Sequence, residues 1–193
     1  VKFFEHQFPD LLDVPSTAKS PQQMFGAIAK TYYADLLGIP REKMVVVSIM
    51  PCLAKKYECA RDEFKVNGNP DVDVVLSTRE LARLIKRMNI DFASLPDQDF
   101  DAPLGESTGA APIFGVTGGV IEAALRTAYE LATGEELKDV NFEAVRGMEG
   151  VRSAKVQVGE HTLNIGTAHE LGNARKLLDE VRAGKSEYHA IEI

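Results

Sequence analysis

Cysteine is scarce in this 193-residue sequence, and its two thiols are too few for a disulfide framework. Cys52 and Cys59 stand seven positions apart, which is the spacing of neither a zinc finger nor a CxxC redox pair. An iron-sulfur cluster with all-cysteine ligation takes four thiolates. The four histidines are scattered and never form a paired-ligand spacing such as HExxH. The sequence therefore does not indicate a metal site built entirely within this chain.

Basic charge and long apolar runs are also lacking. The formal net charge is -7, so the sequence offers no concentrated basic surface for nucleic acid. The densest basic cluster lies on one helix over residues 79–87, where a solvated face is the first interpretation and docking of an acidic redox partner the alternative. No run reaches the about 20 apolar residues that span a bilayer, and the first residues lack the features of a signal peptide. These absences predict a cytoplasmic protein without a membrane span.

What is present is a hydrophobic pattern that alternates between helix and strand, as in an α/β fold. The tetrapeptide SPQQ at residues 20–23 matches a capping box with proline at the first helical position, which predicts a helix from Pro21 to about Leu37. The apolar residues expected on its inward face are Met24, Phe25, Ile28 and Leu36. Residues 44–50 form a continuous apolar run typical of a parallel strand covered on both faces. Residues 71–76 predict a second strand, and STRE at residues 77–80 predicts a capped helix after it.

The second half of the sequence predicts further strands and helices. Residues 91–113 form a long polar connection, and a glycine-rich segment over 114–119 leads into a helix. Residues 151–158 and 161–168 flank a tight turn and predict a hairpin, with residues 141–148 as another strand. TAHE at 167–170 matches a capping box for the last helix.

The predicted fold class is α/β, with two lobes of mainly parallel or mixed sheets flanked by helices and an active site between the lobes. The first lobe is expected over residues 1–115, and residues 116–193 are expected to form part of the second.

Two segments could carry chemistry. Cys52 follows a predicted strand directly, and ligands of open α/β folds bind beyond the carboxyl ends of strands. Lys55 and Lys56 would favour its thiolate form, which bonds metals, whereas a buried structural cysteine with two surface lysines is the alternative. Backbone donors of the glycine-rich segment 114–119 could bind an anion at a helix start. That segment fits neither GxGxxG nor GxxxxGK[ST], so close packing is the alternative there.

The segment MPCLAKKYE at residues 50–58 resembles the second signature motif of iron-only hydrogenases, MPCxxKKxE, at every specified position. Residues 16–23, 77–82 and 113–126 also resemble that family, in the right order and spacing. The resemblance implies an active site called the H-cluster. In it, a cubane iron-sulfur cluster is joined through a cysteine thiolate to a two-iron site with carbonyl and cyanide ligands. Four cysteines from three motifs hold the cubane.

The resemblance also implies a role for each matching residue. Cys52 would be one of the four cubane ligands, and Lys55 would donate a charge-assisted hydrogen bond to a cyanide. Ser16 would belong to a proton relay, since a hydroxyl both accepts and donates, although an ordinary loop hydroxyl is the alternative. The residues expected to line the pocket are Met50, Pro51, Ser20, Pro21, Gln22, Phe114 and Gly115.

The chain departs from the family in two motifs. TSCCPxW is expected immediately before Val1, and a glycine-rich stretch with two more cysteines just after Ile193; neither is present. The chain also begins without Met and stops where an apolar pattern restarts. We therefore expect an excised segment that is inactive by itself and needs the flanking segments of the same protein to hold the H-cluster. Cys59 matches no ligand position.

The resemblance implies that the intact protein is an anaerobic enzyme that reversibly reduces protons to dihydrogen. Its electrons would come from ferredoxin or from a nicotinamide-linked (NADH) chain of partner subunits. The first alternative is a related, non-catalytic protein of cytosolic iron-sulfur assembly. The second is a nucleotide-binding α/β domain, which would require the segment 114–119 to bind phosphate.

Overall fold

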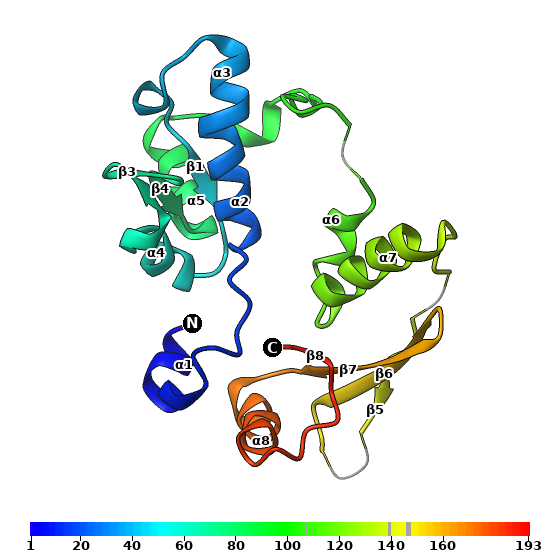
Figure 1. Ribbon diagram of the computed structural model, residues 1–193. Coiled ribbons are helices and arrows are strands. Elements are labelled where there is room, and N and C mark those ends of the chain that lie inside the picture. The colour runs from blue at the N-terminus through cyan, green and yellow to red at the C-terminus, as the bar shows by residue number, and fades with distance from the viewer. Residues whose placement is uncertain (107, 139, 146–147) are drawn as a thin grey trace. The chain divides into compact units, whose positions relative to one another are not determined.

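The computed structural model describes residues 1–106, 108–138, 140–145 and 148–193. They form two compact units, Val1–Glu106 and Ser107–Ile193, and each combines helices with a parallel or mixed sheet (Figure 1). The α/β class is therefore confirmed, whereas the predicted lobe boundary between residues 115 and 116 stays a prediction. No described helix is long and apolar enough to cross a membrane.

The first unit contains short strands among helices. Its elements are α1 (Lys2–Gln7), η1 (Pro9–Leu11), α2 (Pro21–Ile28), η2 (Ala29–Tyr33), α3 (Ala34–Leu37), η3 (Arg41–Lys43), β1 (Val47–Ile49), α4 (Ala54–Cys59), η4 (Asp62–Phe64), β2 (Lys65–Val66), β3 (Asn69–Pro70), β4 (Val74–Leu76), α5 (Thr78–Arg87) and η5 (Phe92–Ser94). Strands β1 and β4 pair in parallel, with Ser48 opposite Val75, as the apolar run predicted. Strands β2 and β3 form a small antiparallel hairpin.

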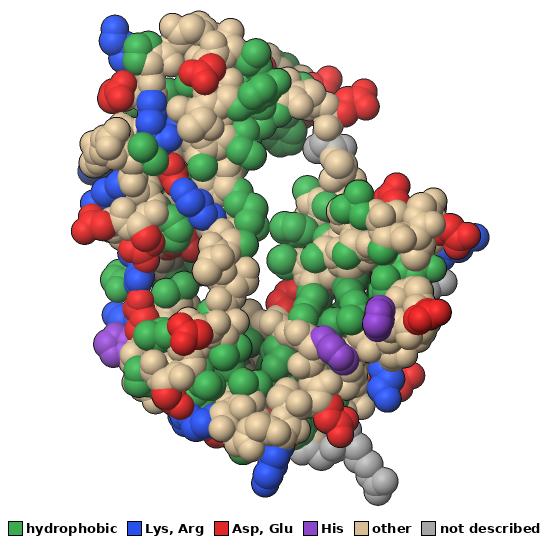
Figure 2. All heavy atoms as spheres, in the orientation of Figure 1, with side chains coloured by type: hydrophobic (Ala, Val, Ile, Leu, Met, Phe, Trp, Pro, Cys, Tyr) green, Lys and Arg blue, Asp and Glu red, His purple; other side chains and the backbone are tan. Residues whose placement is uncertain are grey.

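The helix predicted over residues 21–37 is present as one continuous rod, but its predicted inward face is wrong. It is α-helical in α2 and α3 and passes through a π-helical turn in η2. Its four predicted core residues are between 43% and 62% exposed, and Figure 2 shows hydrophobic side chains gathered beside α2 and α3. The buried side instead carries Gln23, Gly26, Ala29, Lys30 and Ala34.

A buried ammonium explains this orientation. Lys30 is 1% exposed, and its Nζ donates to the carbonyl oxygen of Pro70 at 2.7 Å and to Oδ1 of Asp73 at 2.8 Å. A third acceptor is Oδ1 of Asn69 at 3.3 Å. A buried charge without such partners costs several kcal/mol. The side of the helix that carries Lys30 must therefore face residues 69–73, and the apolar side is left exposed.

A second buried charge strengthens the same junction. Asp71 is 1% exposed, and its carboxylate accepts from Lys19 Nζ at 2.5 Å and from Arg41 Nη2 at 2.6 Å. Burial raises the pKa of the Asp71 carboxyl, but the hydrogen bonds from the two cations outweigh it, so that this pKa lies below its usual value. The loop before β4 is thus fixed to the helix by paired charges.

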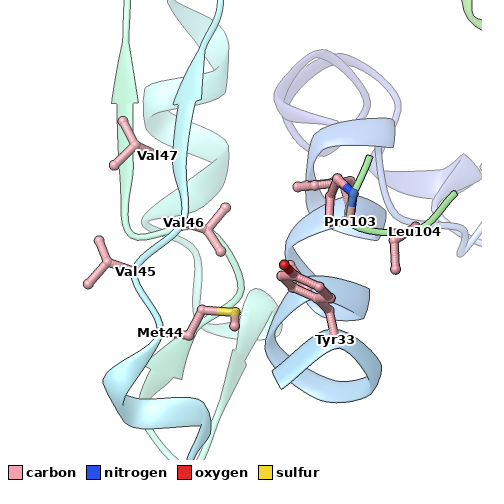
Figure 3. Close-up of a pocket in the computed structure, with 9 residues that line it drawn as sticks. Tyr33, Met44, Val45, Val46, Val47, Pro103 and Leu104 are labelled. Atoms are coloured by element: carbon pink, nitrogen blue, oxygen red, sulfur yellow. The ribbon is translucent and has the colours of Figure 1, made fainter. Parts of the chain in front are cut away.

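Strand β1 is covered on one face only, so the prediction of two covered faces is wrong. Met44, Val46, Ser48 and Met50 are partly buried, whereas Val45, Val47 and Ile49 are 68%, 50% and 53% exposed. In Figure 3, Val46 points toward the helix that carries Tyr33, and Val45 and Val47 point the other way. Exposure alternates along the strand because one layer of helix, α2 with η2, covers the face of this two-stranded sheet toward which Val46 points.

The second unit is a four-stranded mixed sheet with helices. Its elements are α6 (Ala110–Ile113), α7 (Gly119–Thr133), β5 (Glu143–Ala144), β6 (Val151–Val158), β7 (His161–Ala168), α8 (Leu171–Arg182) and β8 (Ala190–Glu192). The predicted hairpin is confirmed as β6 and β7, while β7 and β8 run parallel. Leu125 of α7 packs on Val156 and Ile165 in the core. Of the strand predicted over 141–148, β5 covers two residues, and residues 146–147 lie outside the described part.

The capping box predicted at residues 167–170 is wrong. Strand β7 continues to Ala168, and Thr167 pairs with Arg152 on one side and with Glu192 on the other. The residue that precedes α8 is Glu170, which has a positive φ of 72° and no side-chain cap. Pairing with strands on both sides keeps Thr167 extended, so its hydroxyl cannot cap the helix.

The close contact between α2 and the loop before β4 can be tested at Gly26. A Cβ on Gly26 would lie 2.5 Å from the carbonyl oxygen of Asp71 and 2.8 Å from Cγ2 of Val72. Gly26→Ala should therefore lower the free energy of unfolding by about 1–3 kcal/mol, measured by urea denaturation. The matched control is Gly172→Ala, because a Cβ on Gly172 of α8 meets nothing within 4 Å. Alanine there should stabilise the chain slightly. Equal effects of the two substitutions would contradict the proposed clash.

Candidate functional site

The loop from Met50 to Glu58 carries the candidate site, and it begins where β1 ends. The backbone N–H of Met50 donates to the carbonyl oxygen of Leu76 at 2.8 Å, which extends the pairing of β1 with β4. The carbonyl oxygen of Cys52 then accepts from the N–H of Lys55 at 3.2 Å, and this turn leads into α4. Cys52 is an exposed free thiol. The cysteine thus lies beyond the carboxyl end of a parallel strand, as predicted.

The carboxylate of Glu58 gathers the polar groups around this loop. Its Oε1 accepts from Nζ of Lys55 at 2.9 Å. Its Oε2 accepts from the hydroxyl of Ser20 at 2.7 Å and from Nε2 of Gln22 at 2.9 Å. Burial raises the pKa of the Glu58 carboxyl, but the three hydrogen bonds and the charge of Lys55 outweigh it, so that the pKa is lowered. The sequence indicated no role for Glu58 beyond its place in the motif.

The structure also corrects the interpretation of Ser20. It occupies the N-cap position of α2, but its side chain makes no capping hydrogen bond. The hydroxyl donates to Glu58, 38 residues away, instead. Gln22 is equally engaged, because its Oε1 accepts from the hydroxyl of Ser48 at 2.9 Å. SPQQ therefore joins the site loop to α2, and the expected contacts of Ser20, Pro21 and Gln22 with a cofactor stay predictions.

The two lysines of the motif point to different partners. Lys55 pairs with Glu58, whereas Lys56 pairs with Glu80 of α5 at 2.8 Å and donates to the carbonyl oxygen of Val75 at 2.7 Å. Both are therefore engaged in ion pairs with glutamates, so they are not two free cations beside the Cys52 thiol. Glu80 also belongs to the predicted capping box with Ser77, which is confirmed.

The second cysteine has a structural setting. The Cys59 thiol donates to the carbonyl oxygen of Lys56 at 3.2 Å within α4. Burial raises the pKa of this thiol, and the neighbouring charge of Glu58 adds to the effect. A thiol held in its neutral form is a poor metal ligand. This setting agrees with the absence of Cys59 from the ligand positions of the motif.

The remaining predicted site residues are placed as follows. Ser16 is exposed, and its Oγ accepts from the N–H of Ala18 at 3.1 Å, an ordinary turn contact. Phe114 and Gly115 follow α6 in the second unit, whereas Cys52 belongs to the first. The relay role of Ser16 and the shared pocket with Phe114 and Gly115 stay predictions.

The glycine-rich start of α7 already binds a carboxylate of this chain. Oε1 of Glu192 accepts from the N–H of Gly118 at 3.0 Å, and Oε2 accepts from the N–H of Ile121 at 2.7 Å. Gly118 has a φ of 87°, which favours glycine. Because these donors face an anionic side chain that would repel phosphate, the structure gives no support to the nucleotide-binding alternative.

An apolar pocket in the first unit lies apart from these polar groups. Its lining includes Tyr33, Met44, Val46, Pro103 and Leu104, and it encloses about 290 Å³ (Figure 3). No charged, cysteine or histidine side chain lines it. None of the predicted site residues belongs to its lining.

The donor set of the chain fits a shared metal site. Among the described residues, no group of three or more His, Cys, Asp or Glu side chains could hold a metal ion. A cubane cluster takes four thiolates, and here Cys52 offers a single exposed thiol. These residues fit a site in which the chain supplies one cluster ligand.

Comparison with known proteins identifies the family. The model of the iron-only hydrogenase large subunit, C-terminal domain, matches residues 1–193. The chain belongs to the iron-only hydrogenase large-subunit family. Within this hydrogenase family, the NADP-reducing hydrogenase subunit HndD of Solidesulfovibrio fructosivorans is 81% identical over the whole chain. The periplasmic [Fe] hydrogenase large subunit of Nitratidesulfovibrio vulgaris is 50% identical over 99% of the chain. The chain spans only 33% and 45% of these two relatives.

Solved hydrogenases have the same fold. A structure described as showing stepwise H-cluster assembly in [FeFe]-hydrogenase HydA is 37% identical, with a TM-score of 0.82. It matches 99% of this chain, which covers 55% of that structure. Assembly proteins are more distant relatives: cytosolic iron-sulfur assembly component 3 of Rattus norvegicus is 28% identical over 95% of the chain and is matched over 40% of its own length.

The ion pair of Glu80 should make stability depend on pH. The hydrogen bond from Lys56 and those with Ser77 lower the pKa of Glu80 from 4.5 to about 2. The stabilisation of the fold by ionised Glu80 is therefore fully present above pH 4.5 and is lost as the pH falls toward 2. Glu80→Gln keeps an acceptor for the cap but removes the charge. The loss of stability it causes should be largest at pH 7 and shrink below pH 4.5, measured by urea denaturation at several pH values. Glu136→Gln at an exposed position is the control, and the same pH profile for both would contradict this role.

Proposed function

We propose that this chain is the part of a hydrogenase H-cluster domain that supplies one cubane ligand and the cation beside the two-iron site. The intact enzyme would interconvert protons and electrons with dihydrogen. The observation that carries the proposal is the exposed Cys52 thiol at the turn that leads into Lys55, whose ammonium is held by Glu58. The 81% identity to a hydrogenase subunit supports it.

The proposed roles follow from the groups that each residue offers. The H-cluster, when bound, supplies the metal centre at which protons and electrons combine. Cys52 would bind the cubane iron through its sulfur, and Lys55 would donate to an anionic ligand of the two-iron site. Met50 and Pro51 stand directly before the thiol and would line the cofactor pocket. Ser20, Pro21, Gln22, Phe114 and Gly115 would form other walls, and Ser16 would pass a proton.

Assembly of iron-sulfur clusters without hydrogen chemistry is the competing function. Proteins named for cytosolic iron-sulfur assembly match most of this chain at 27% to 32% identity, whereas the two hydrogenase relatives described above are 50% and 81% identical. The higher identity supports the enzyme, and dihydrogen production distinguishes the two functions directly.

The proposal can be tested in a hybrid subunit, in which this chain replaces the matching 193 residues of HndD. After maturation with the H-cluster, the hybrid subunit should evolve dihydrogen from a reduced dye at a rate comparable to HndD. Cys52→Ala should abolish this activity and reduce the iron content, because a cubane ligand is lost. Cys59→Ala is the matched control and should retain both the dihydrogen evolution and the iron content.

The same experiment includes the isolated chain. Reconstituted with iron and sulfide, it should give little stable cubane absorbance, because the sequence supplies one candidate ligand of four. A stoichiometric cluster on the isolated chain, or an active Cys52→Ala hybrid subunit, would contradict the proposed site.

The electron partner and location form a separate part of the proposal. The name of the relative HndD describes NADP reduction, which supports nicotinamide-linked partner subunits over ferredoxin. We keep a cytoplasmic location, although one hydrogenase relative is named as periplasmic. Dihydrogen-dependent reduction of NADP should therefore be found in the cytoplasmic fraction of the source organism. Activity confined to the periplasm, or coupled to ferredoxin alone, would contradict it.

A further inference from the structure

We infer that Glu58 is a positioning residue, whose carboxylate holds the ammonium of Lys55 and joins the Cys52 loop to the start of α2. The inference rests on the proposed function, because it concerns how Lys55 is directed toward a cofactor ligand. It deepens that function by giving a role to the last residue of the MPCxxKKxE motif.

Both carboxylate oxygens of Glu58 are fixed by hydrogen bonds. Lys55 occupies Oε1 at 2.9 Å, while Ser20 and Gln22 occupy Oε2 at 2.7 Å and 2.9 Å. The side chain is 17% exposed. A carboxylate with donors from two separate segments cannot turn away from Lys55 without breaking hydrogen bonds at a partly buried position.

Lys55 keeps N–H donors for a further acceptor while it pairs with Glu58. A lysine three residues before a glutamate on an exposed helix forms a weak pair that salt screens. Here the two added donors hold the carboxylate, which in turn restricts the flexible lysine stem. An ammonium has three N–H donors, and the Glu58 contact uses one of them. The remaining donors can therefore serve a second acceptor while Glu58 keeps its place.

The hydrogen bonds around Glu58 extend to the strand before Cys52. The hydroxyl of Ser48 in β1 donates to Oε1 of Gln22 at 2.9 Å, which directs Nε2 of Gln22 toward Glu58. Glu58 thus connects α4, the start of α2 and β1. This connection links the ammonium of Lys55 to the strand that Cys52 follows.

The neighbouring pair of Lys56 and Glu80 provides a matched comparison. It also joins a lysine of the motif to a glutamate, at 2.8 Å. Glu80, however, caps α5, and the partners of its carboxylate are Ser77 and Lys56. A substitution there removes an ion pair of the same kind without releasing Lys55.

The test uses the matured hybrid subunit and the infrared bands of its cyanide ligands, together with iron content and dihydrogen evolution. The variant Lys55→Gln serves as the reference, because it gives the positions of the cyanide bands when the cation is absent. Glu58→Gln should shift these bands in the same direction with unchanged iron content, and it should lower dihydrogen evolution by about ten- to hundredfold. Glu58→Asp keeps the charge on a shorter stem and should give a smaller shift. Glu80→Gln should leave the bands in place.

Each outcome decides between the alternatives. Cyanide bands of Glu58→Gln that coincide with those of Glu80→Gln would show that Glu58 has only a structural role and would overturn the inference. If Glu58→Gln does not fold, Glu58→Asp decides by the same criterion. A hybrid subunit without cyanide bands before any substitution would overturn the proposed function, and the inference with it.

Discussion

The buried ammonium of Lys30 is the constraint on which the first unit depends. Its three acceptors, on Asn69, Pro70 and Asp73, fix one side of the long helix against the loop before β4. The start of that helix carries Ser20 and Gln22, and the end of the loop leads into the strand that pairs with β1. The same buried charge therefore sets both the helix start and the strand end that meet at Glu58.

Regular elements could be predicted from the sequence where local pattern and packing agree. The capping box before α5, the β6–β7 hairpin and the parallel pairing of β1 with β4 were predicted from short-range features. The apolar run over residues 44–50 predicted the position of Cys52 beyond a strand end. In each case the residues that decide the outcome are close in sequence or belong to one continuous pattern.

The wrong predictions depend on contacts between distant residues. Ser20 matched a cap, but its hydroxyl bonds Glu58, and no local pattern shows a partner 38 residues away. The apolar side of the helix over residues 21–37 was predicted to face the core. The side that carries the ion-paired Lys30 faces it instead. Thr167 matched a cap and is held in a strand by pairing on both sides. Glu58 itself had no predicted role, because its partners come from two segments.

The one-sided covering of β1 has a consequence for the behaviour of the chain in solution. Strands β1 and β4 form a two-stranded sheet, so each has an unpaired edge among the described residues. The exposed side chains of Val45, Val47 and Ile49 border one of these edges. An apolar face beside a free strand edge can recruit a strand from another molecule. We therefore expect self-association to compete with folding when this chain is produced alone, and charged substitutions at these three positions to reduce it.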